Sequence, residues 1–297
     1  LNVPILISTA FEGQCSVDVA AAIKWNEQES HTKYYNKRPF KKCVNDPEGA
    51  QMRGGYSGKK EYECIFKPKN ATGTIKILVI CNSIAHRATK ILKPIIEQNF
   101  PQISLMRLYA MSACQPVDPV KKCRPYFDGV QKLVLKPDVT FFISDNSKRL
   151  MAPFLNGTDD AATTDLTVFL QSLANSSRFV VVDEFYPRPS TSAGMTTSTH
   201  KRLLRKQSTT DLKGTYESFR ERYSNYFARL DRVHIPNVIR HNTGAAICAE
   251  EKGWCWWYNR KNLHAYFTDN LHFTMDGLEL LQDSYTNVLK NVVEKIG

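Results

Sequence analysis

Residues 75–92 read Ile75-Lys-Ile-Leu-Val-Ile-Cys-Asn-Ser-Ile-Ala-His-Arg-Ala-Thr-Lys-Ile-Leu92, and this stretch decides the fold. Its first six residues are apolar apart from one lysine and rich in β-branched side chains, which is typical of a strand buried on both faces. The pattern from Ala85 onward is helical. The stretch therefore predicts a core strand that leads directly into a helix, with Ser83 at the transition.

Further apolar runs alternate with helix candidates along the chain. The predicted strands are 103–109, 139–143 and 179–183, and the predicted helices are 165–174, 216–230 and 274–293. Strands that alternate with helices imply parallel pairing, with helices covering both faces of the sheet. We therefore predict one α/β domain in three layers, α/β/α, around a central parallel sheet. An apolar stripe on the last helix is formed by Leu278, Leu280, Leu281, Tyr285, Val288 and Leu289.

The first 72 residues differ from the rest in composition. They are rich in Lys, Tyr, Asn and Gly, show weak apolar periodicity and contain turn-forming sequence at 43–58. We expect residues 1–72 to form a lead-in segment held by a disulfide, and residues 73–297 to form the main domain. The polar stretch 187–199 is expected to be a long mobile loop. Because the chain begins at Leu1 without an initiator Met or a signal-peptide pattern, we expect it to be cut from a longer protein.

Eight cysteines stand at positions 15, 43, 64, 81, 114, 123, 248 and 255, and none has the C-x-x-C spacing of a zinc site, so no metal is expected. Cys15 and Cys81 either bond to each other or stay as thiols. The alternative to disulfide bonding is a cytosolic protein with eight reduced thiols. The disulfides that the spacings favour are Cys43–Cys64, Cys114–Cys123 and Cys248–Cys255.

Three N-glycosylation sequons begin at Asn70, Asn156 and Asn175. Together with the cysteines they favour an oxidising location, on the lumenal or extracellular face of a membrane in the secretory pathway. No stretch reaches the ~20 uninterrupted apolar residues of a membrane helix. The net charge is +11, with basic clusters at 37–42 and 200–206 that either bind anions or are solvated loop surface. Since no nucleic-acid-binding signature is present, no nucleic acid partner is expected.

Ser83 follows the first core strand and stands at the start of a helix. Ligands of open parallel sheets bind beyond the carboxyl ends of the strands, so this position can present a reactive hydroxyl. The orphan N–H groups of the helix N-terminus can stabilise an oxyanion there. The structural alternative is that Ser83 is only the N-cap of the helix, a role that serine fills well.

Asp269-Asn-Leu-His272 precedes the last predicted helix. In a D-x-x-H turn the carboxylate can hold one imidazole nitrogen while the other faces a nucleophile, which fixes the tautomer. The other six histidines have no comparable acidic neighbour at a strand-to-helix edge. The alternative is a surface histidine beside a helix capped by Thr274.

The chain is similar to SGNH (GDSL-type) hydrolases. Cys81-Asn-Ser83 resembles their first block, Gly-Asp/Asn-Ser, and Asp269-x-x-His272 resembles their last block. Residues 141–146, Phe-Phe-Ile-Ser-Asp-Asn146, lie where the third block is expected. The similarity is closest to the SGNH domain that is fused behind a membrane acyltransferase-3 domain. Residues 111–123 resemble the Cys-x-Pro loop of that SGNH domain. The later parts of that pattern resemble residues 185–189 and 255–272, and the resemblance covers roughly residues 40–297.

The resemblance implies a flavodoxin-like SGNH fold and gives three residues catalytic roles. Ser83 is expected as the nucleophile, His272 as the general base and Asp269 as the acid that orients it. The expected oxyanion donors are the backbone N–H of Ser83, an N–H near Ser112 or Ala113, and the side chain of Asn146. The chain departs from the family where Cys81, Ser112 and Ser144 replace glycines and where Ile84 replaces a common histidine.

The resemblance also implies the reaction. An acetyl or another short acyl group would pass through an acyl-serine intermediate to a hydroxyl acceptor, a carbohydrate or a lipid, without a bound cofactor. A covalently linked membrane acyltransferase domain would deliver the acyl group from acyl-CoA. Two alternatives stay open: a stand-alone carbohydrate or lipid O-acyl esterase, and a catalytically inactive, glycosylated lumenal binding domain, which the departures at Cys81 and Ile84 favour.

Overall fold

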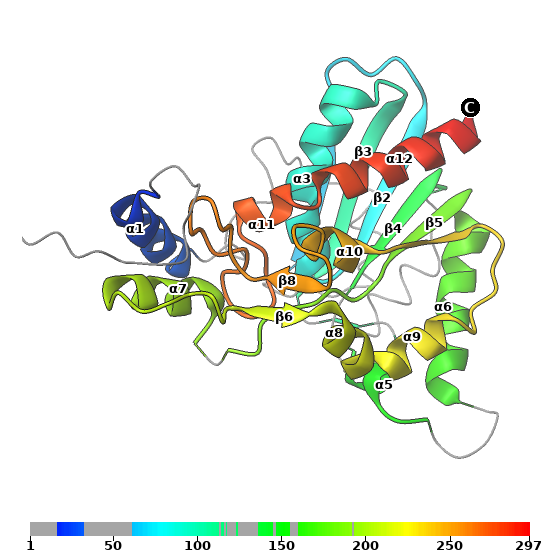
Figure 1. Cartoon of the computed structure of the whole chain (residues 1–297). Coiled ribbons are helices and arrows are strands. Elements are labelled where there is room, and N and C mark those ends of the chain that lie inside the picture. The colour runs from blue at the N-terminus through cyan, green and yellow to red at the C-terminus, as the bar shows by residue number, and fades with distance from the viewer. Residues whose placement is uncertain are drawn as a thin grey trace, which may run out of the picture.

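A six-stranded sheet forms the centre of the molecule (Figure 1). The computed structural model describes residues 17–32, 61–112, 114–115, 117, 123, 136–144, 147–154, 160–191 and 193–297. The strand order is β1-β3-β2-β4-β5-β7, and all neighbours pair in parallel except β1, which runs antiparallel to β3. The strands are β1 Glu61–Phe66, β2 Ile75–Cys81, β3 Ile103–Met111, β4 Val139–Ile143, β5 Phe179–Asp183 and β7 Val238–His241.

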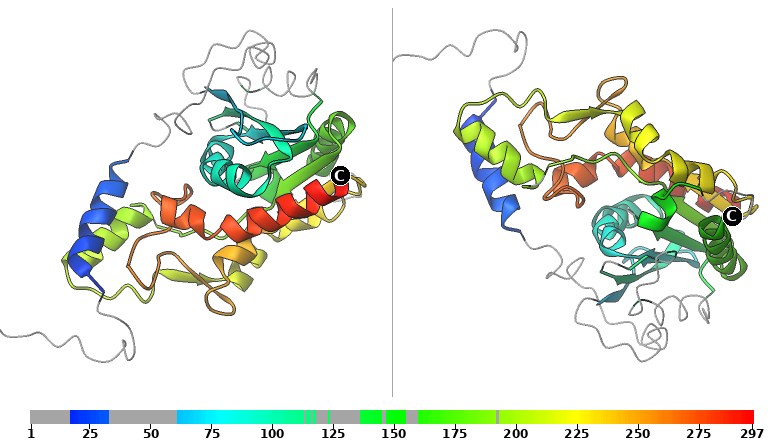
Figure 2. Two further views of the ribbon diagram at one scale, coloured as in Figure 1. Left: turned by 90° about the horizontal axis from the view of Figure 1, so that it is seen from above. Right: turned by 90° about the horizontal axis from the view of Figure 1, so that it is seen from below.

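Helices cover both faces of this sheet (Figure 2). On one face α3 (Ser83–Asn99) and α12 (Gln282–Ile296) pack against alternate strand residues such as Val79 and Phe141. On the other face α6 (Ala161–Ser176) and α9 (Ser224–Leu230) pack against the intervening residues, among them Ile80 and Phe142. The predicted three-layer α/β/α architecture is therefore confirmed, and the sheet is mostly rather than wholly parallel.

The lead-in segment contributes two elements to this architecture. Strand β1 pairs with β3 along its whole length, and helix α1 (Val19–Ser30) packs against α7 (Met195–Leu204). Asn26 of α1 is buried and bonds to the backbone of Leu263 and Ala265, because an amide can serve a carbonyl and an N–H at once. The domain boundary after residue 72 stays a prediction.

Two predicted helices are each divided. The last one consists of α11 (Met275–Glu279), capped by Thr274 as expected, and α12, with a tighter turn between them in which the Leu281 N–H bonds to Leu278 O. The helix predicted at 216–230 is divided at Tyr223, whose ψ of 17° departs from helical geometry, into α8 (Tyr216–Arg222) and α9. In the stretch 187–199, which was predicted as a loop, α7 begins at Met195.

Three short elements complete the fold. A small antiparallel sheet of β6 (Lys213–Thr215) and β8 (Trp254–Trp256) lies beside α8, and α10 (Thr243–Ile247) follows β7. Figure 1 places all of these near the end of the main sheet where α3 begins. Within the part of the chain that the structure describes, no helix has both the length and the apolar character to cross a membrane.

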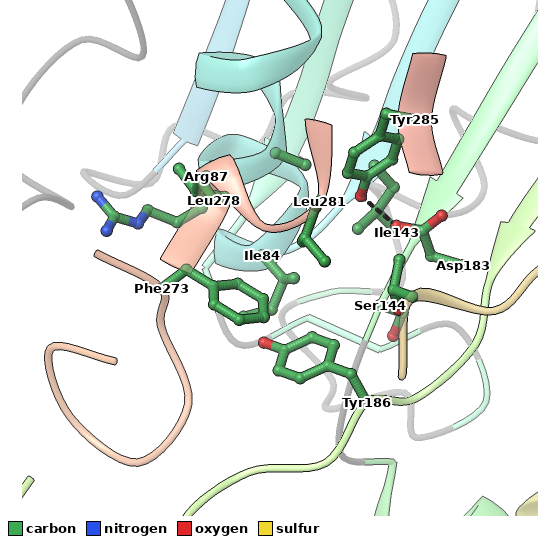
Figure 3. A pocket seen from close by; sticks show the side chains of 12 residues that line it. Ile84, Arg87, Ile143, Ser144, Asp183, Tyr186, Phe273, Leu278, Leu281 and Tyr285 are labelled. Carbon is green, nitrogen blue, oxygen red and sulfur yellow. Dashed lines mark hydrogen bonds between the residues drawn. The ribbon is translucent and has the colours of Figure 1, made fainter. Parts of the chain in front are cut away.

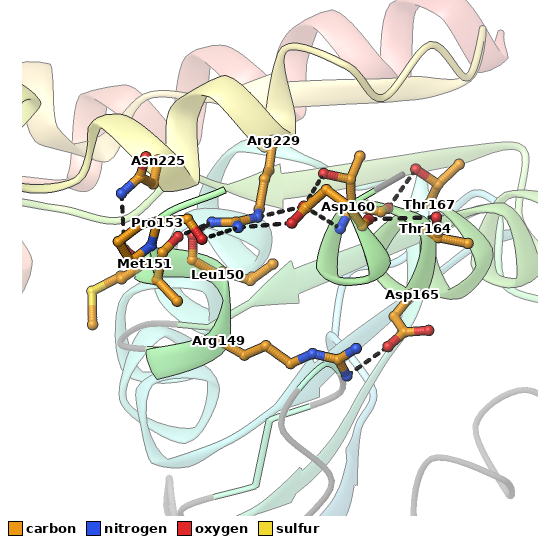
Figure 4. Close-up of polar contacts among 12 residues, drawn as sticks. Arg149, Leu150, Met151, Pro153, Asp160, Thr164, Asp165, Thr167, Asn225 and Arg229 are labelled. Atoms are coloured by element: carbon orange, nitrogen blue, oxygen red, sulfur yellow. Dashed lines mark hydrogen bonds and ion pairs between the residues drawn. The ribbon is translucent and has the colours of Figure 1, made fainter. Parts of the chain in front are cut away.

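A buried ion pair fixes α9 to the start of α6 (Figure 4). The Arg229 guanidinium donates to both oxygens of Asp160, at 2.7 and 2.9 Å, and to the carbonyls of Leu150 and Ala152 beside α5 (Lys148–Met151). Hydrogen bonding from Arg229 lowers the pKa of the Asp160 carboxyl well below its usual range, against the opposing effect of burial. The buried charges of Arg229 and Asp160 thus compensate each other.

Candidate active site

Ser83, His272 and Asp269 form one hydrogen-bonded chain at the carboxyl end of β2. Ser83 Oγ lies 2.8 Å from His272 Nε2, and His272 Nδ1 lies 2.7 Å from Asp269 Oδ2. Ser83 is the first residue of α3, and the other two residues stand in the turn before α11. The structure therefore brings together the three predicted residues, in the arrangement that the expected roles of nucleophile, base and orienting acid require.

The residue that caps α3 is Asn82. Its side chain accepts a hydrogen bond from the Ile84 N–H at 3.0 Å, which is the usual role of an N-cap residue. The Ser83 hydroxyl is thus left to His272, and the interpretation of Ser83 as the helix cap is wrong. Ser83 stays partly exposed, whereas Asn82 is buried.

The carboxyl group of Asp269 is held in its charged form. Burial raises its pKa, but hydrogen bonds from the His272 side chain and from the backbone N–H groups of Leu271 and His272 outweigh burial and lower the pKa to about 2. About half of the Asp269 side chain is exposed, against 24% of His272. A charged carboxylate at Nδ1 orients the imidazole ring so that Nε2 lies toward Ser83 Oγ.

The turn that carries His272 is supported from three sides. Thr268 donates to His272 O from both its N–H, at 2.8 Å, and its hydroxyl, at 3.1 Å. The Tyr186 hydroxyl, beyond the end of β5, donates to Leu271 O. Gly194, with a φ of 80°, lies so close that a Cβ there would come within 3.1 Å of Asp269 Cα. The segment that follows β5 therefore packs directly on the D-x-x-H turn.

Cys81 has a backbone conformation that favours glycine. Its φ is 132°, a region that costs a residue with a side chain on the order of 1–3 kcal/mol. This geometry suits glycine, the residue expected here from the resemblance to the first block. The Cys81 thiol is fully buried and contacts the Cys114 carbonyl at 3.5 Å, and burial raises its pKa to about 12. It is therefore a neutral thiol and not a nucleophile, and Cys15 lies outside the described residues.

The expected oxyanion donors are only partly described. The Ser83 N–H is in the first turn of α3, where backbone N–H groups have no intrahelical acceptor. Ser112 follows β3 and is partly exposed, whereas Ala113 and Asn146 lie outside the described residues. Ser144, in a family glycine position, is buried and donates to Gln115 Oε1 at 2.5 Å. The oxyanion assignment stays a prediction.

The structure contains two of the predicted disulfides. Cys114–Cys123 lies in the loop after β3, and Cys248–Cys255 joins the end of α10 to β8. Cys64 is also disulfide-bonded, and its predicted partner Cys43 lies outside the described residues. Of the sequons, Asn70 and Asn175 are exposed, and Asn156 lies outside the described residues.

A narrow cavity lies behind the site, between α3 and the α11–α12 turn (Figure 3). Ile84 lines it, together with Tyr186 and the buried Arg87. Burial lowers the pKa of the Arg87 guanidinium to about 10, although the charges of Glu29 and Asp269 raise it. Arg87 thus stays protonated at neutral pH. With room for little more than a water molecule, this cavity is too small for an acyl acceptor.

A second chain of Asp, His and Ser is present at the ends of β5 and β7. His241 Nδ1 lies 2.6 Å from Asp183 Oδ1, and its Nε2 lies 2.7 Å from the hydroxyl of Ser284 in α12. The expectation that no other histidine has such an acidic neighbour is wrong for His241, because strand pairing places Asp183 opposite it. Tyr285 donates to the other Asp183 oxygen, so these bonds tie α12 to the sheet.

Comparison with known proteins gives one family match. A family model described as the SGNH domain (fused to AT3 domains) matches residues 42–287, and no curated protein matches. Among solved structures, an acetylxylan esterase from Geobacillus stearothermophilus is 12% identical with a TM-score of 0.40, over 72% of this chain and 94% of that chain. An alpha/beta hydrolase enzyme from the metagenome of Lake Arreo, Spain, is 11% identical with a TM-score of 0.42, over 73% and 97%.

Proposed function

Because this chain belongs to the family of SGNH domains fused to AT3 domains, we propose that it transfers an acetyl or other short acyl group to a hydroxyl acceptor. The observation that carries the proposal is the Ser83–His272–Asp269 chain of hydrogen bonds at the carboxyl end of β2. A serine hydroxyl becomes a useful nucleophile only when a base can take its proton, and His272 Nε2 is within proton-transfer distance.

In the first half of the reaction, Ser83 Oγ attacks the carbonyl carbon of the acyl donor and its proton passes to His272 Nε2. The imidazolium that forms is stabilised by the Asp269 carboxylate at Nδ1. The Ser83 N–H at the start of α3 faces the developing oxyanion, aided by the helix dipole. His272 then gives the proton to the leaving group, and an ester to Ser83 remains.

In the second half, the acceptor hydroxyl takes the place of the leaving group. His272 removes its proton as the acceptor oxygen attacks the acyl carbon, and the tetrahedral intermediate collapses with return of that proton to Ser83 Oγ. The product is an acylated acceptor and the free serine. No cofactor is consumed, because the donor ester or thioester supplies the acyl group.

The family description supports a further part of the proposal. A covalently linked AT3 membrane domain would supply the acyl group, with acyl-CoA as the upstream donor. The disulfides Cys114–Cys123 and Cys248–Cys255 support a lumenal or extracellular position, because disulfides persist in oxidising compartments.

Hydrolysis is the second candidate, with water as the acceptor. It is favoured by the openness of the site, since half of the Asp269 side chain and 24% of that of His272 are exposed. Water can then reach the acyl-serine. A chromogenic ester without an added acceptor separates the two candidates. For the proposed transferase we expect a burst of one leaving group per chain followed by slow turnover, whereas a hydrolase would turn over without a burst-limited slow phase.

Fluorophosphonate labelling tests whether Ser83 is a nucleophile at all. We expect wild type to label on Ser83, Ser83→Ala not to label, and His272→Ala to label at least about a hundredfold more slowly. Ser284→Ala is the matched control, because Ser284 has the same histidine contact in the second chain; it should label like wild type. Equal labelling of wild type and Ser83→Ala contradicts the proposal, and labelling on Ser284 would move the nucleophile to α12.

A further inference from the structure

A wide pocket opens beside the candidate active site, where the segment after β5 meets α8 and the small β6–β8 sheet. Its volume is about 220 Å³, which is below the range of about 300–1,000 Å³ typical of sites for drug-sized ligands. Its lining residues are Pro187, Arg188, Ser190, Lys213, Gly214, Thr215, Ser218, Phe219, Arg222, Tyr223 and Trp257.

The lining of this pocket is cationic. The lining residues that the structure describes include three basic side chains and no carboxylate. Arg222 donates to the hydroxyl of Ser190 at 3.2 Å, and Arg188 donates to the hydroxyl of Tyr223 at 3.0 Å. Among the described residues, no carboxylate lies within ion-pair distance of Lys213 or Arg222. Lys213 and Arg222 therefore line the pocket without a described counter-ion.

Aromatic rings hold Lys213 and Gly214 in place. Lys213 Nζ lies 3.9 Å above the ring of Trp254 and 4.6 Å above that of Trp256, which are cation–π distances. The ring of Trp257 packs on Gly214 so closely that a Cβ there would come within 2.7 Å of it. The site is thus preorganised, which limits the entropy lost when a ligand binds.

One segment connects the pocket to the catalytic turn. Residues 187–190 form a wall of the pocket, and the next residues contact the turn, since Asn270 donates to Thr191 O at 3.4 Å and Gly194 packs on Asp269. Trp257, which also lines the pocket, contacts Phe267, with ring centroids 6.0 Å apart. A ligand held in the pocket therefore lies next to the residues that position His272.

We propose that this pocket binds a negatively charged sugar of the acyl acceptor, one that carries a carboxylate, sulfate or phosphate group, through Lys213, Arg222 and Arg188. The inference rests on the proposed function and names its acceptor class. Guanidinium groups bind oxyanions through paired N–H donors, and the lining hydroxyls of Ser190, Thr215 and Ser218 match a polyhydroxylated ring. The net charge of +11 also attracts such an acceptor from a distance.

The lining favours a sugar over a lipid headgroup. A lipid site needs exposed apolar side chains beside the headgroup for the acyl chains. The exposed large hydrophobic residues among those described are Val19, Val168, Leu204 and Met275, and none of them lines the pocket.

Titration calorimetry on the full chain tests the inference, with Ser83→Ala as the parent protein so that binding is measured without turnover. The probes are methyl β-D-glucuronide, neutral methyl β-D-glucoside, sodium sulfate and dihexanoyl phosphatidylglycerol. We expect the glucuronide to bind at least about tenfold more tightly than the other three, as one charge-assisted contact allows. Equal binding of glucuronide and glucoside overturns the inference, as does tighter binding of sulfate or of the lipid.

Variants then assign the binding to the pocket. Lys213→Gln and Arg222→Gln should each weaken glucuronide binding about tenfold, whereas Lys213→Arg, which keeps the charge, should retain it. Lys290→Gln and Arg205→Gln remove exposed charges that do not line the pocket and should bind like the parent. Unchanged binding in both pocket variants overturns the inference. Failure of wild type to label with fluorophosphonate would instead contradict the proposed acyl transfer and leave this binding result intact.

Discussion

The hydroxyl of Tyr186 donates a 2.7 Å hydrogen bond to the carbonyl oxygen of Leu271. This bond joins the segment beyond β5 to the residue that precedes His272, so it links the sheet to the turn that carries the base. The Tyr186 side chain is 3% exposed and also packs on Phe273, with ring centroids 4.7 Å apart. The position of His272 thus depends on a residue that takes no part in the proton transfer.

Tyr186→Phe should keep this packing and lose the hydrogen bond. We expect the free energy of unfolding to fall by about 1 kcal/mol and kcat for a chromogenic acetyl ester to fall about five- to tenfold, with KM little changed. The kcat effect arises because His272 loses part of its support. Urea unfolding and steady-state kinetics measure the two quantities. A fall in stability with an unchanged kcat would show that Tyr186 has only a structural role.

The stability of the folded chain should depend on the ionisation of Asp269. Its carboxyl pKa is about 2 in the folded protein, against an ordinary value of 3.8. Because folding lowers this pKa, the stabilisation is fully present above about pH 4 and is lost as the pH falls toward about 2. Half of the side chain is exposed, so screening by solvent reduces the expected effect to about 1 kcal/mol.

Urea unfolding of wild type and Asp269→Asn between about pH 6 and pH 2 measures this contribution. The difference between the two free energies of unfolding should be constant down to about pH 4 and then shrink. A difference that stays constant to about pH 2 would show that Asp269 has an ordinary pKa in the folded chain.

The backbone at Cys81 predicts an unusual order of stabilities. Cys81→Ala keeps a Cβ at a φ of 132°, whereas Cys81→Gly removes it, and both lose the buried sulfur. We expect the glycine variant to be more stable than the alanine variant by about 1 kcal/mol, although glycine usually costs stability through the entropy of the unfolded chain. Thermal and urea unfolding compare the two. If the alanine variant is the more stable, the backbone at position 81 is not strained.

Peptide mapping without reduction should assign the remaining disulfide. Cys64 is bonded and Cys81 is a buried thiol, so we expect Cys43–Cys64 beside the two disulfides described above. Cys81 should react with iodoacetamide only after denaturation, because burial raises its pKa to about 12. A Cys15–Cys64 peptide would contradict the predicted pairing.

The central strands and the residues Ser83, His272 and Asp269 could be predicted because their sequence signals are local. Residues 75–80 are apolar apart from Lys76, and the two blocks around Ser83 and His272 each lie within a few residues. Strand β1 could not be recognised in the same way, since it is an edge strand in a polar segment and only alternate residues, such as Cys64 and Phe66, are buried. Its partner β3 is far along the chain, so the pairing depends on tertiary contacts.

Other features depend on strand pairing and on tertiary contacts that cannot be inferred from the sequence. Asp183 and His241 meet because β5 pairs with the four-residue strand β7, which has no clear pattern of its own. The pocket beside α8 depends on the contact between α8 and β6, which brings Lys213 and Arg222 into one lining. Helix breaks such as the one at Tyr223 reflect packing of the flanking aromatic rings rather than a proline or a glycine.

The division of roles between Asn82 and Ser83 has a practical consequence. Since the helix start is secured by the asparagine, replacing the serine by alanine removes the reacting oxygen and spares the scaffold. A protein altered in that way should hold an unreacted ester in its natural pose for crystallography. The chain thus offers a ready means of trapping its own substrate.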